Sequence, residues 1–390
     1  MAGCDVLIVG AGPAGAVAGT ILARAGARVR IVDRATFPRD KLCGDTVNPG
    51  TVARLQHLDM AGDLCERSLR VCGMLVTGER GVTVEGRYPD GQYGLAILRR
   101  DFDWMLLQHA ISAGCVFEPG VTVRRAVLDD RGPTRKVCGV ISAAPAGEIE
   151  WTAPVTIAAD GRHSTLAFSL GLARHPSTPR RWAIGAYYEN FRPDGMRAPS
   201  IFGEMHIRRG RYIGISPVAG GTTNVCLVRP SQPADAELRD PSALLDHELA
   251  RDPFLRERAA GARRLAPPVV LGPLAVDPTG HSIDGLLTAG DASGFIDPMT
   301  GDGLGFAIRG AELAAASALR SLERGWSGVH ADLDDERRHL FRGKWRFNRA
   351  LRALVASPRA VEVAAIGALL APAVLRAVIA RAGDCHLVPG

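Results

Sequence analysis

The residues with the clearest chemical meaning form a glycine-rich turn near the N-terminus, Gly10-Ala11-Gly12-Pro13-Ala14-Gly15. A continuous apolar run, Val6 to Val9, precedes the turn, a stretch of small residues follows it, and a second strand-like run ends at Asp33. In such a unit the first glycine permits the tight turn, the second lets the backbone approach a pyrophosphate, and the third lets helix and strand pack closely. The start of the helix would stabilise the phosphates, and Asp33 would bind a ribose hydroxyl. The spacing predicts a dinucleotide-binding site.

Two later segments carry a similar mixture of acidic residues and glycines. Asp160-Gly161 ends a buried strand-like run and is either part of a ligand-binding loop or an ordinary Asp-Gly turn. Gly290-Asp291 follows the strand-like run 286–289, and the glycines of 301–305 precede a long predicted helix. Asp291 is suited to accept hydrogen bonds from a polyol, and the glycine backbone is suited to lie flat against a ring system. The helix start would stabilise negative charge that develops on that ring.

The elements that must position these residues change character along the chain. Buried runs alternate with helical patterns at both ends of the first 330 residues, as in a parallel α/β sheet, whereas 183–228 reads as antiparallel strands separated by turns. We therefore expect an α/β fold with a discontinuous Rossmann-like domain (1–70, 95–175 and 275–330). An antiparallel-sheet substrate domain (71–94 and 176–274) is inserted in it, and a helical C-terminal segment (331–390) follows.

Composition and charge exclude several classes of partner. The net charge is +6, but only three of the 47 cationic residues are lysines, and no basic run alternates with aromatic residues, so no nucleic-acid partner is expected. The eight cysteines show no CxxC pair and no metal-ligand spacing with histidine, which predicts a reduced cytoplasmic protein without a metal. No signal-peptide pattern follows Met1. The longest apolar stretch, Val363 to Leu375, is too short to span a bilayer and indicates either a packed helix or a peripheral membrane contact.

The order of the three glycine motifs resembles the FAD-dependent oxidoreductases of the glutathione-reductase-2 type, and among them the geranylgeranyl-reductase-like flavoproteins. Three segments carry the closer resemblance: Pro38 to Asp45 is similar to their PxxKxCG segment, Arg99 to Asp103 to their RxxFD helix start, and Asp297 to Gly303 to their DPxTGEG loop. The GxWxWxIP segment of the related halogenases is absent. Where the prenyl reductases have an aromatic YxWxFP segment, this chain reads Tyr212-Ile213-Gly214-Ile215-Ser216-Pro217.

The resemblance implies a bound FAD and a role for each motif. Asp33 would bind the adenosine ribose, and Arg99 and Asp160-Gly161 would lie near the pyrophosphate. Asp291 would bind the ribityl and pyrophosphate region, and Pro298 to Gly303 would pass the isoalloxazine. The full cofactor-binding set that it implies is Gly10, Gly12, Pro13, Ala14, Gly15, Asp33, Arg34, Cys43, Gly44, Arg99, Asp160, Gly161, Gly290, Asp291, Pro298, Gly301, Gly303 and Leu304. Since the chain has a single glycine-rich Rossmann turn, the flavin would be reduced by NAD(P)H that docks transiently or by another electron donor.

Cys43 and Asp45 are the candidate catalytic residues. Arg39 and Lys41 are near enough in sequence to lower the pKa of the Cys43 thiol, although a free cysteine is often simply a small buried hydrophobic residue. The sequence favours hydride transfer through flavin N5 to a hydrophobic small molecule, isoprenoid or polyketide-like, with a proton from Asp45 or Cys43. Two alternatives are a flavin monooxygenase that uses NAD(P)H and O₂ and a non-catalytic flavin or lipid carrier. The sequence carries no signal for the oligomeric state.

Overall fold

A five-stranded parallel sheet forms the centre of the first part of the computed structural model, which describes residues 3–132, 134–145, 147–177, 181–191, 201–230, 235–296, 299 and 301–388. The strand order is β21 (Leu286–Thr288), β12 (Val155–Ala158), β1 (Val6–Val9), β2 (Val29–Asp33) and β8 (Val116–Pro119). All neighbours pair in parallel. All four residues of β1 and of β12 are buried, as expected for strands that are covered on both faces.

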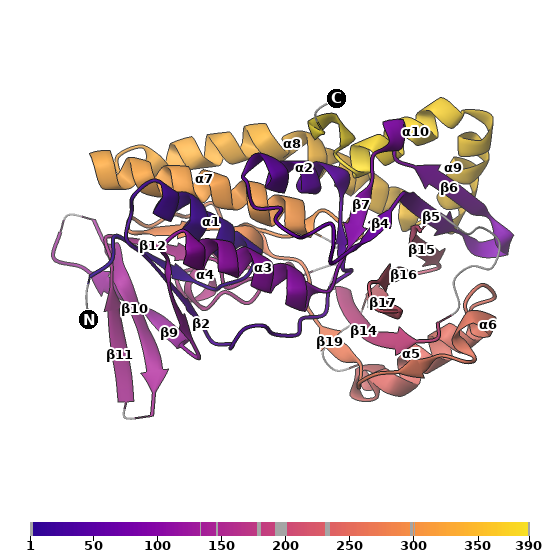
Figure 1. Ribbon diagram of the computed structural model, residues 1–390, viewed down its shortest axis with the longest axis horizontal. Helices are drawn as coiled ribbons and strands as arrows, with labels where there is room; N and C mark the ends of the chain where they lie inside the picture. Colours follow the sequence, from indigo (N-terminus) through magenta and orange to yellow (C-terminus); the bar gives the residue numbers. More distant parts are fainter. Residues whose placement is uncertain are drawn as a thin grey trace.

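The two faces of this sheet are covered by different elements (Figure 1). Val6 and Ile8 pack against the helices α1 (Pro13–Arg24), α3 (Arg99–Ser112) and α7 (Gly303–Arg324). Leu7 and Val9 point the other way, toward an antiparallel sheet of β9 (Thr122–Asp129), β10 (Lys136–Ala144) and β11 (Gly147–Thr152). The alternation follows from the two-residue period of a strand.

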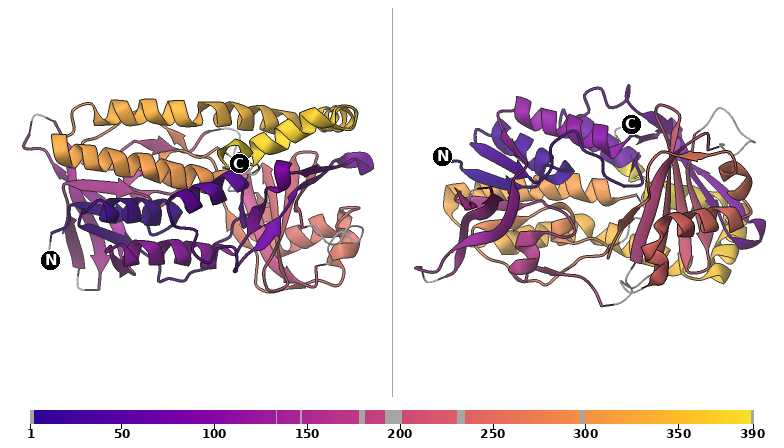
Figure 2. Two further views of the ribbon diagram at one scale, coloured as in Figure 1. Left: turned by 45° about the horizontal axis from the view of Figure 1, so that its top comes forward. Right: turned by 90° about the horizontal axis from the view of Figure 1, so that it is seen from below.

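An eight-stranded sheet forms the other half of the molecule (Figure 2). Its main path is β18 (Arg263–Arg264), β14 (Arg181–Glu189), β17 (Thr222–Pro230), β16 (Arg211–Val218), β15 (Gly203–Arg208), β5 (Gly73–Thr77) and β6 (Thr83–Arg87), and β19 (Val269–Leu271) also pairs with β14. The chain enters this sheet early, with β5 and β6, and again after residue 180. The β15–β5 pair that joins the two visits is parallel, and the others are antiparallel.

The two faces of the eight-stranded sheet also differ. Ile184, Ile213 and Val225 face α5 (Pro241–Arg251) and the short α6 (Arg256–Ala259). On the opposite face Tyr212, Val228 and Met205 belong to a cluster that includes Met299, Val361 and side chains of the C-terminal helices. The second face therefore lies toward the Gly301–Gly305 segment.

Smaller elements connect the two halves. A three-stranded sheet joins β3 (Thr46–Val47), β7 (Gly94–Ala96) and β4 (Leu69–Val71), and α2 (Pro49–His57) follows β3. The helix α4 (Thr165–Ser169) follows β12, and β13 (Ala173–Arg174) pairs with β20 (Asp277–Pro278).

The C-terminal segment is helical, with α8 (Val329–Val355), α9 (Pro358–Leu370) and α10 (Pro372–Ala382) ending in a short turn, η6 (Cys385–Leu387). The helix α8 packs along α7, whereas α9 and α10 contact β6 at the far end of the eight-stranded sheet (Figure 1). Among the residues described, no helix has the length and apolar character needed to cross a membrane.

Candidate functional site

Three motifs that are far apart in the sequence meet at the carboxyl edge of the parallel sheet. Gly10, Asp160 and Gly290 follow β1, β12 and β21, which are neighbours in the sheet. Gly10 has a φ of 104°, and a Cβ there would lie 2.4 Å from the Ala159 oxygen. A Cβ on Gly290 would lie 2.9 Å from the Cβ of Ala14. The absence of side chains at these glycines allows the three loops to approach one another, and ligands of open α/β sheets bind at this edge.

The start of α1 has no side-chain cap. Gly12 is its N-cap and supplies no side-chain hydrogen bond to the first turn, and Pro13 occupies the first helical position. A Cβ on Gly15 would lie only 1.8 Å from the Gly10 oxygen, so this turn tolerates no other residue without a backbone shift. The unpaired N–H groups and the positive end of the helix dipole make the start of α1 suitable for an anion such as a phosphate.

Asp33 holds the glycine-rich turn in place from the end of β2. Its Oδ2 accepts from the Ala11 N–H at 2.7 Å, and its Oδ1 accepts from the Ala35 N–H at 2.8 Å. Each carboxylate oxygen keeps a further lone pair for a hydroxyl group. The next residue, Arg34, is exposed, and its charge lies near Arg162.

Two arginines share one buried carboxylate beside the turn. Arg99 donates to Asp103 through Nε at 2.7 Å and through Nη2 at 2.9 Å, and Arg39 Nη2 lies 3.0 Å from Asp103 Oδ2. The group therefore keeps one net positive charge. Buried Arg39 Nη1 has no hydrogen-bond partner among the described residues, and Arg39 Nη2 lies 3.7 Å from where a Gly12 Cβ would be. An unsatisfied cationic donor at this place fits a phosphate.

Further charged groups from other loops lie at the same edge. Burial lowers the pKa of Lys41, with repulsion from Arg99 in the same direction, although Asp291 and Asp103 oppose the shift. Burial also lowers the pKa of Arg162, against the attraction of Asp291. In the described part of the chain, buried Arg162 Nε and Asp160 Oδ1 have no hydrogen-bond partner. These donors and the acceptor suit a diphosphate flanked by hydroxyl-bearing groups, so the residues fit the FAD that the sequence motifs imply.

Asp45 connects the segment after β2 to the eight-stranded sheet. It is fully buried, with a φ of 52° that aspartate tolerates better than most residues. Its Oδ2 accepts from the Tyr187 hydroxyl at 2.8 Å and from Asn224 Nδ2 at 2.5 Å, and its Oδ1 accepts from the Arg99 N–H at 3.3 Å. Burial raises the pKa of Asp45 to about 6, because the loss of solvation outweighs the opposing hydrogen bonds from Asn224 and Tyr187.

Cys43 and Gly44 lie beside Asp45. The Cys43 carbonyl accepts from Asn224 Nδ2 at 2.6 Å, and its half-buried thiol lies near the Arg99 guanidinium. Gly44 is exposed.

The loop before α7, which contains Gly301, approaches the segment that contains Cys43, Gly44 and Asp45. A Cβ on Gly301, which has a φ of 67°, would lie 3.5 Å from Thr46 Oγ1, next to Asp45. Gly303 begins α7, and the Leu304 side chain packs into the core below the parallel sheet. Pro298, which we also predict to bind the cofactor, lies outside the described residues.

Asp302 ties this loop to the C-terminal helices. The buried Asp302 carboxylate accepts from Asn48 Nδ2 at 3.2 Å and from Asn348 Nδ2 at 2.9 Å, and Lys344 Nζ lies 3.0 Å from it. Lys344 also pairs with Asp384 at 3.0 Å. The sequence motifs gave no signal for the roles of Asn48, Lys344 and Asn348.

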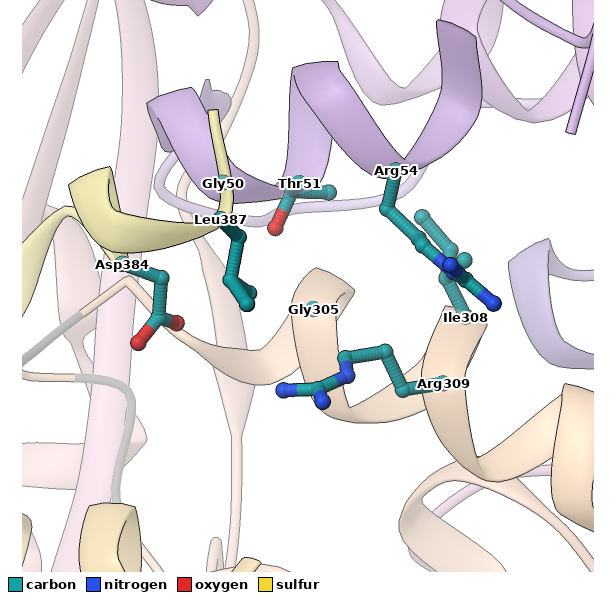
Figure 3. Close-up of a pocket in the computed structure, with 8 residues that line it drawn as sticks. All are labelled: Gly50, Thr51, Arg54, Gly305, Ile308, Arg309, Asp384 and Leu387. Carbon is teal, nitrogen blue, oxygen red and sulfur yellow. The ribbon is translucent and has the colours of Figure 1, made fainter. Parts of the chain in front are cut away.

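A small cavity lies where α2, α7 and η6 meet (Figure 3). Gly50 and Thr51 of α2, Gly305 and Arg309 of α7, and Asp384 are among its lining residues. Its volume of about 10 Å³ is close to that of one water-sized probe, whereas small-molecule sites span roughly 300–1,000 Å³. This cavity is therefore a packing junction and not the place of a cofactor.

Comparisons with known proteins identify the family of this chain. The family model described as FAD binding domain matches residues 3–251. The chain belongs to this family. It is 31% identical over 378 residues to the menaquinone reductase of Mycolicibacterium smegmatis, which covers 92% of this chain and 86% of the relative. It is 32% identical over 325 residues to digeranylgeranylglycerophospholipid reductase 2 of Methanopyrus kandleri, with 82% and 78% covered. The protein is an FAD-dependent oxidoreductase, as the sequence motifs predicted.

The fold agrees with that identification. The structure of the flavin-dependent brominase Bmp2 superposes on this flavoprotein with a TM-score of 0.85, covering 98% of this chain and 94% of the brominase, at 20% identity. At this identity the likeness shows the shared fold. The predicted α/β fold with a Rossmann-like FAD-binding unit, an antiparallel sheet and a helical C-terminus is confirmed.

Arg39 is expected to contribute to FAD affinity through its Nη1, which is unpaired within the described residues. Arg39→Met should weaken FAD binding about 10- to 100-fold, because a charge-assisted hydrogen bond contributes roughly 1.5–3 kcal/mol. The Arg99–Asp103 pair remains in this variant, so the fold should persist. FAD dissociation constants from fluorescence titration measure the effect. Arg28→Met is the matched control, since Arg28 pairs with Asp5 on the surface. Equal FAD affinity in both variants would exclude Arg39 from the phosphate site.

Proposed function

We propose that this flavoprotein reduces a carbon–carbon double bond in a hydrophobic small molecule of isoprenoid or polyketide-like character. The names of two relatives support a reductase, since one is a reductase of menaquinone and the other of digeranylgeranylglycerophospholipid. Bound and reduced FAD supplies the hydride, through its N5 atom. The chain must then bind the substrate, exclude water and deliver one proton to the second carbon of the double bond.

The observation that carries the proposal is the environment of Asp45. Among the described residues, its Oδ2 accepts two hydrogen bonds, from Tyr187 and Asn224, whereas its Oδ1 accepts one, a long bond from the Arg99 N–H. A proton on the neutral carboxyl is therefore best accommodated at Oδ1. With a pKa of about 6, the group holds that proton in a useful fraction of molecules near neutral pH and releases it readily. Asp45 is the proposed proton donor, and Cys43 beside it is the alternative.

The substrate surface that we infer is the face of the eight-stranded sheet that carries Asn224 and Tyr187. Met205, Tyr212 and Cys226 lie on this face and pack in one cluster with Met299, which lies in the loop before α7. Gly214 interrupts the apolar strand β16, and a Cβ there would meet only the Cys226 oxygen, at 3.9 Å. An apolar surface with a few fixed polar groups is typical of small-molecule sites.

The reducing equivalents would come from NAD(P)H that docks transiently, or from another electron donor. The described site offers one set of phosphate-binding features, at the start of α1, and FAD requires that set. NAD(P)H that docks transiently dissociates between turnovers and therefore requires no second dinucleotide-binding domain.

Anaerobic turnover tests the proposal. FAD in the purified protein is reduced with NADPH, NADH or dithionite in the absence of O₂, and geranylgeranyl diphosphate is added. We expect the oxidised flavin spectrum to return and mass spectrometry to find a product that is heavier by two hydrogen atoms. Reoxidation that begins only when O₂ is admitted, with an oxygen atom in the product, would instead establish a monooxygenase.

A further inference from the structure

The C-terminal helices expose large apolar side chains. Val363 on α9 is 70% exposed and Val374 on α10 is 61% exposed, which makes them the most exposed large hydrophobic residues in the described part of the chain. Arg359, Val363 and Gly367 follow one another at four-residue spacing on α9 and are all exposed, so they share one outward face.

The inward faces of the same two helices are fixed to the protein. Ile379 of α10 is buried against β6, where a Cβ on Gly86 would lie 2.4 Å from Ile379 Cγ1. Val361 of α9 is buried in the cluster that contains Met205, Tyr212 and Met299. The α9–α10 hairpin is therefore a firmly attached element with an apolar outer face, and it covers the end of the proposed substrate surface.

The charge of the protein is concentrated on this part of the chain. Residues 340–388 contain eight arginines and lysines but only two acidic residues, and the surplus of six equals the net charge of the whole protein. Arg342, Arg346 and Arg349 are exposed along the second half of α8, and Arg376 is exposed on α10. Of the two acids, Asp384 pairs with Lys344. The charges of the remaining chain sum to zero, so the surplus of the whole protein equals that of the helical end that Figure 1 shows beside β6.

We propose that the α9–α10 hairpin docks this protein on the surface of an anionic lipid bilayer. Apolar side chains flanked by arginines are typical of segments that lie in the membrane interface, where the side chains enter the acyl boundary and the cations attract anionic headgroups. Because no described helix has the length and apolar character to cross a membrane, the contact is peripheral. This inference extends the proposed function, since it makes the bilayer the source of the hydrophobic substrate.

Co-sedimentation with vesicles tests the docking without reference to catalysis. The full-length FAD-loaded protein should sediment with vesicles of equal parts phosphatidylglycerol and phosphatidylcholine, remain in the supernatant with phosphatidylcholine alone, and dissociate as salt is added. The double variant V363E/V374E should lose at least tenfold in partitioning to the anionic vesicles. R359Q/R376Q should lose about as much at low salt and little at high salt.

The matched control places the same substitution elsewhere. Ile111 on α3 and Val116 on β8 are 41% and 49% exposed, and I111E/V116E should bind vesicles like the unaltered protein. FAD absorbance and thermal melting verify that each variant is folded. Protein that stays in the supernatant with both lipids overturns the proposal. So does a dimer in light scattering that V363E/V374E converts to a monomer, because the face would then be a contact between two copies.

Failure of the docking and failure of the reductase assignment give different results. V363E/V374E should reduce a short-chain, water-soluble prenyl substrate at the unaltered rate in the absence of vesicles, and be slower only with substrate embedded in them. If the unaltered protein sediments with anionic vesicles but reduces no such substrate, the docking stands and the proposed function fails.

Discussion

Gly15→Ala is expected to produce a protein that does not retain FAD. The new Cβ would lie 1.8 Å from the Gly10 oxygen, so either the turn or α1 must move, and the first turn of α1 is what presents N–H groups to the phosphates. We expect FAD affinity to fall by at least 100-fold, which corresponds to about 3 kcal/mol. Flavin absorbance per chain after gel filtration, followed by titration with added FAD, measures the loss.

Gly310→Ala is the control for this substitution. Gly310 also lies in a helix beside the site, but a Cβ there has its nearest neighbour, the Gly290 N, at an ordinary 3.9 Å. The alanine should favour the helix and leave the flavin content unchanged. A Gly15→Ala protein that stays as yellow as Gly310→Ala would show that the glycine-rich turn and the start of α1 do not bind the FAD phosphates.

Asp45→Asn is expected to lower the anaerobic rate of substrate reduction by about 10²- to 10⁴-fold, the usual contribution of a positioned general acid. Asparagine also tolerates the left-handed backbone at this position, so the fold and FAD content should be preserved. Stopped-flow reoxidation of the pre-reduced flavin by substrate measures the chemical step. The matched control is Asp40→Asn, because Asp40 lies in the same segment and its side chain is 85% exposed.

The pH dependence gives a second readout for Asp45. The neutral acid predominates below its pKa of about 6, so the proton-dependent rate should be highest below pH 6 and fall as the pH rises above it. The contribution of Asp45 to the free energy of unfolding also decreases as the pH rises. A carboxyl whose pKa is raised in the folded state stabilises that state fully below its unfolded value, and this contribution is lost as the pH rises toward 6. Relative to Asp45→Asn, the protein should lose about 2 kcal/mol of unfolding free energy between pH 4 and pH 7.

A pH profile that Asp45→Asn leaves unaltered would assign the proton to another group. Cys43→Ser is then the informative variant, since Cys43 is adjacent and its thiol lies near Arg99.

The sequence predicted the parts of the site that the backbone makes. Gly10, Gly15 and Gly290 are required because Cβ atoms there would collide with neighbouring atoms. This steric requirement produces a spacing of glycines that can be recognised in the sequence. The alternation of Val6, Leu7, Ile8 and Val9 between two cores likewise shows as a continuous apolar run. The parallel order of the strands then follows from the rules that govern βαβ units.

Side-chain partners from distant strands could not be predicted in the same way. Asn224 lies on β17, 179 residues from Asp45, and its only sequence signal is a polar residue at the start of the apolar run 225–228. Pairing of β14 with β17 in register brings Tyr187 opposite Asn224, and both then reach Asp45. The Asp302–Lys344 pair could not be predicted from the sequence either. The helix α8 carries many cationic residues, and only its packing on α7 determines which of them is buried.

The visible absorption spectrum of the purified protein, recorded before and after incubation with FAD and gel filtration, tests the central claim most directly. We expect the two-banded spectrum of a bound flavin, near one FAD per chain, that is bleached by dithionite. A folded protein that elutes colourless and takes up no FAD from solution would contradict the convergence of Gly10, Asp160 and Gly290 on that cofactor.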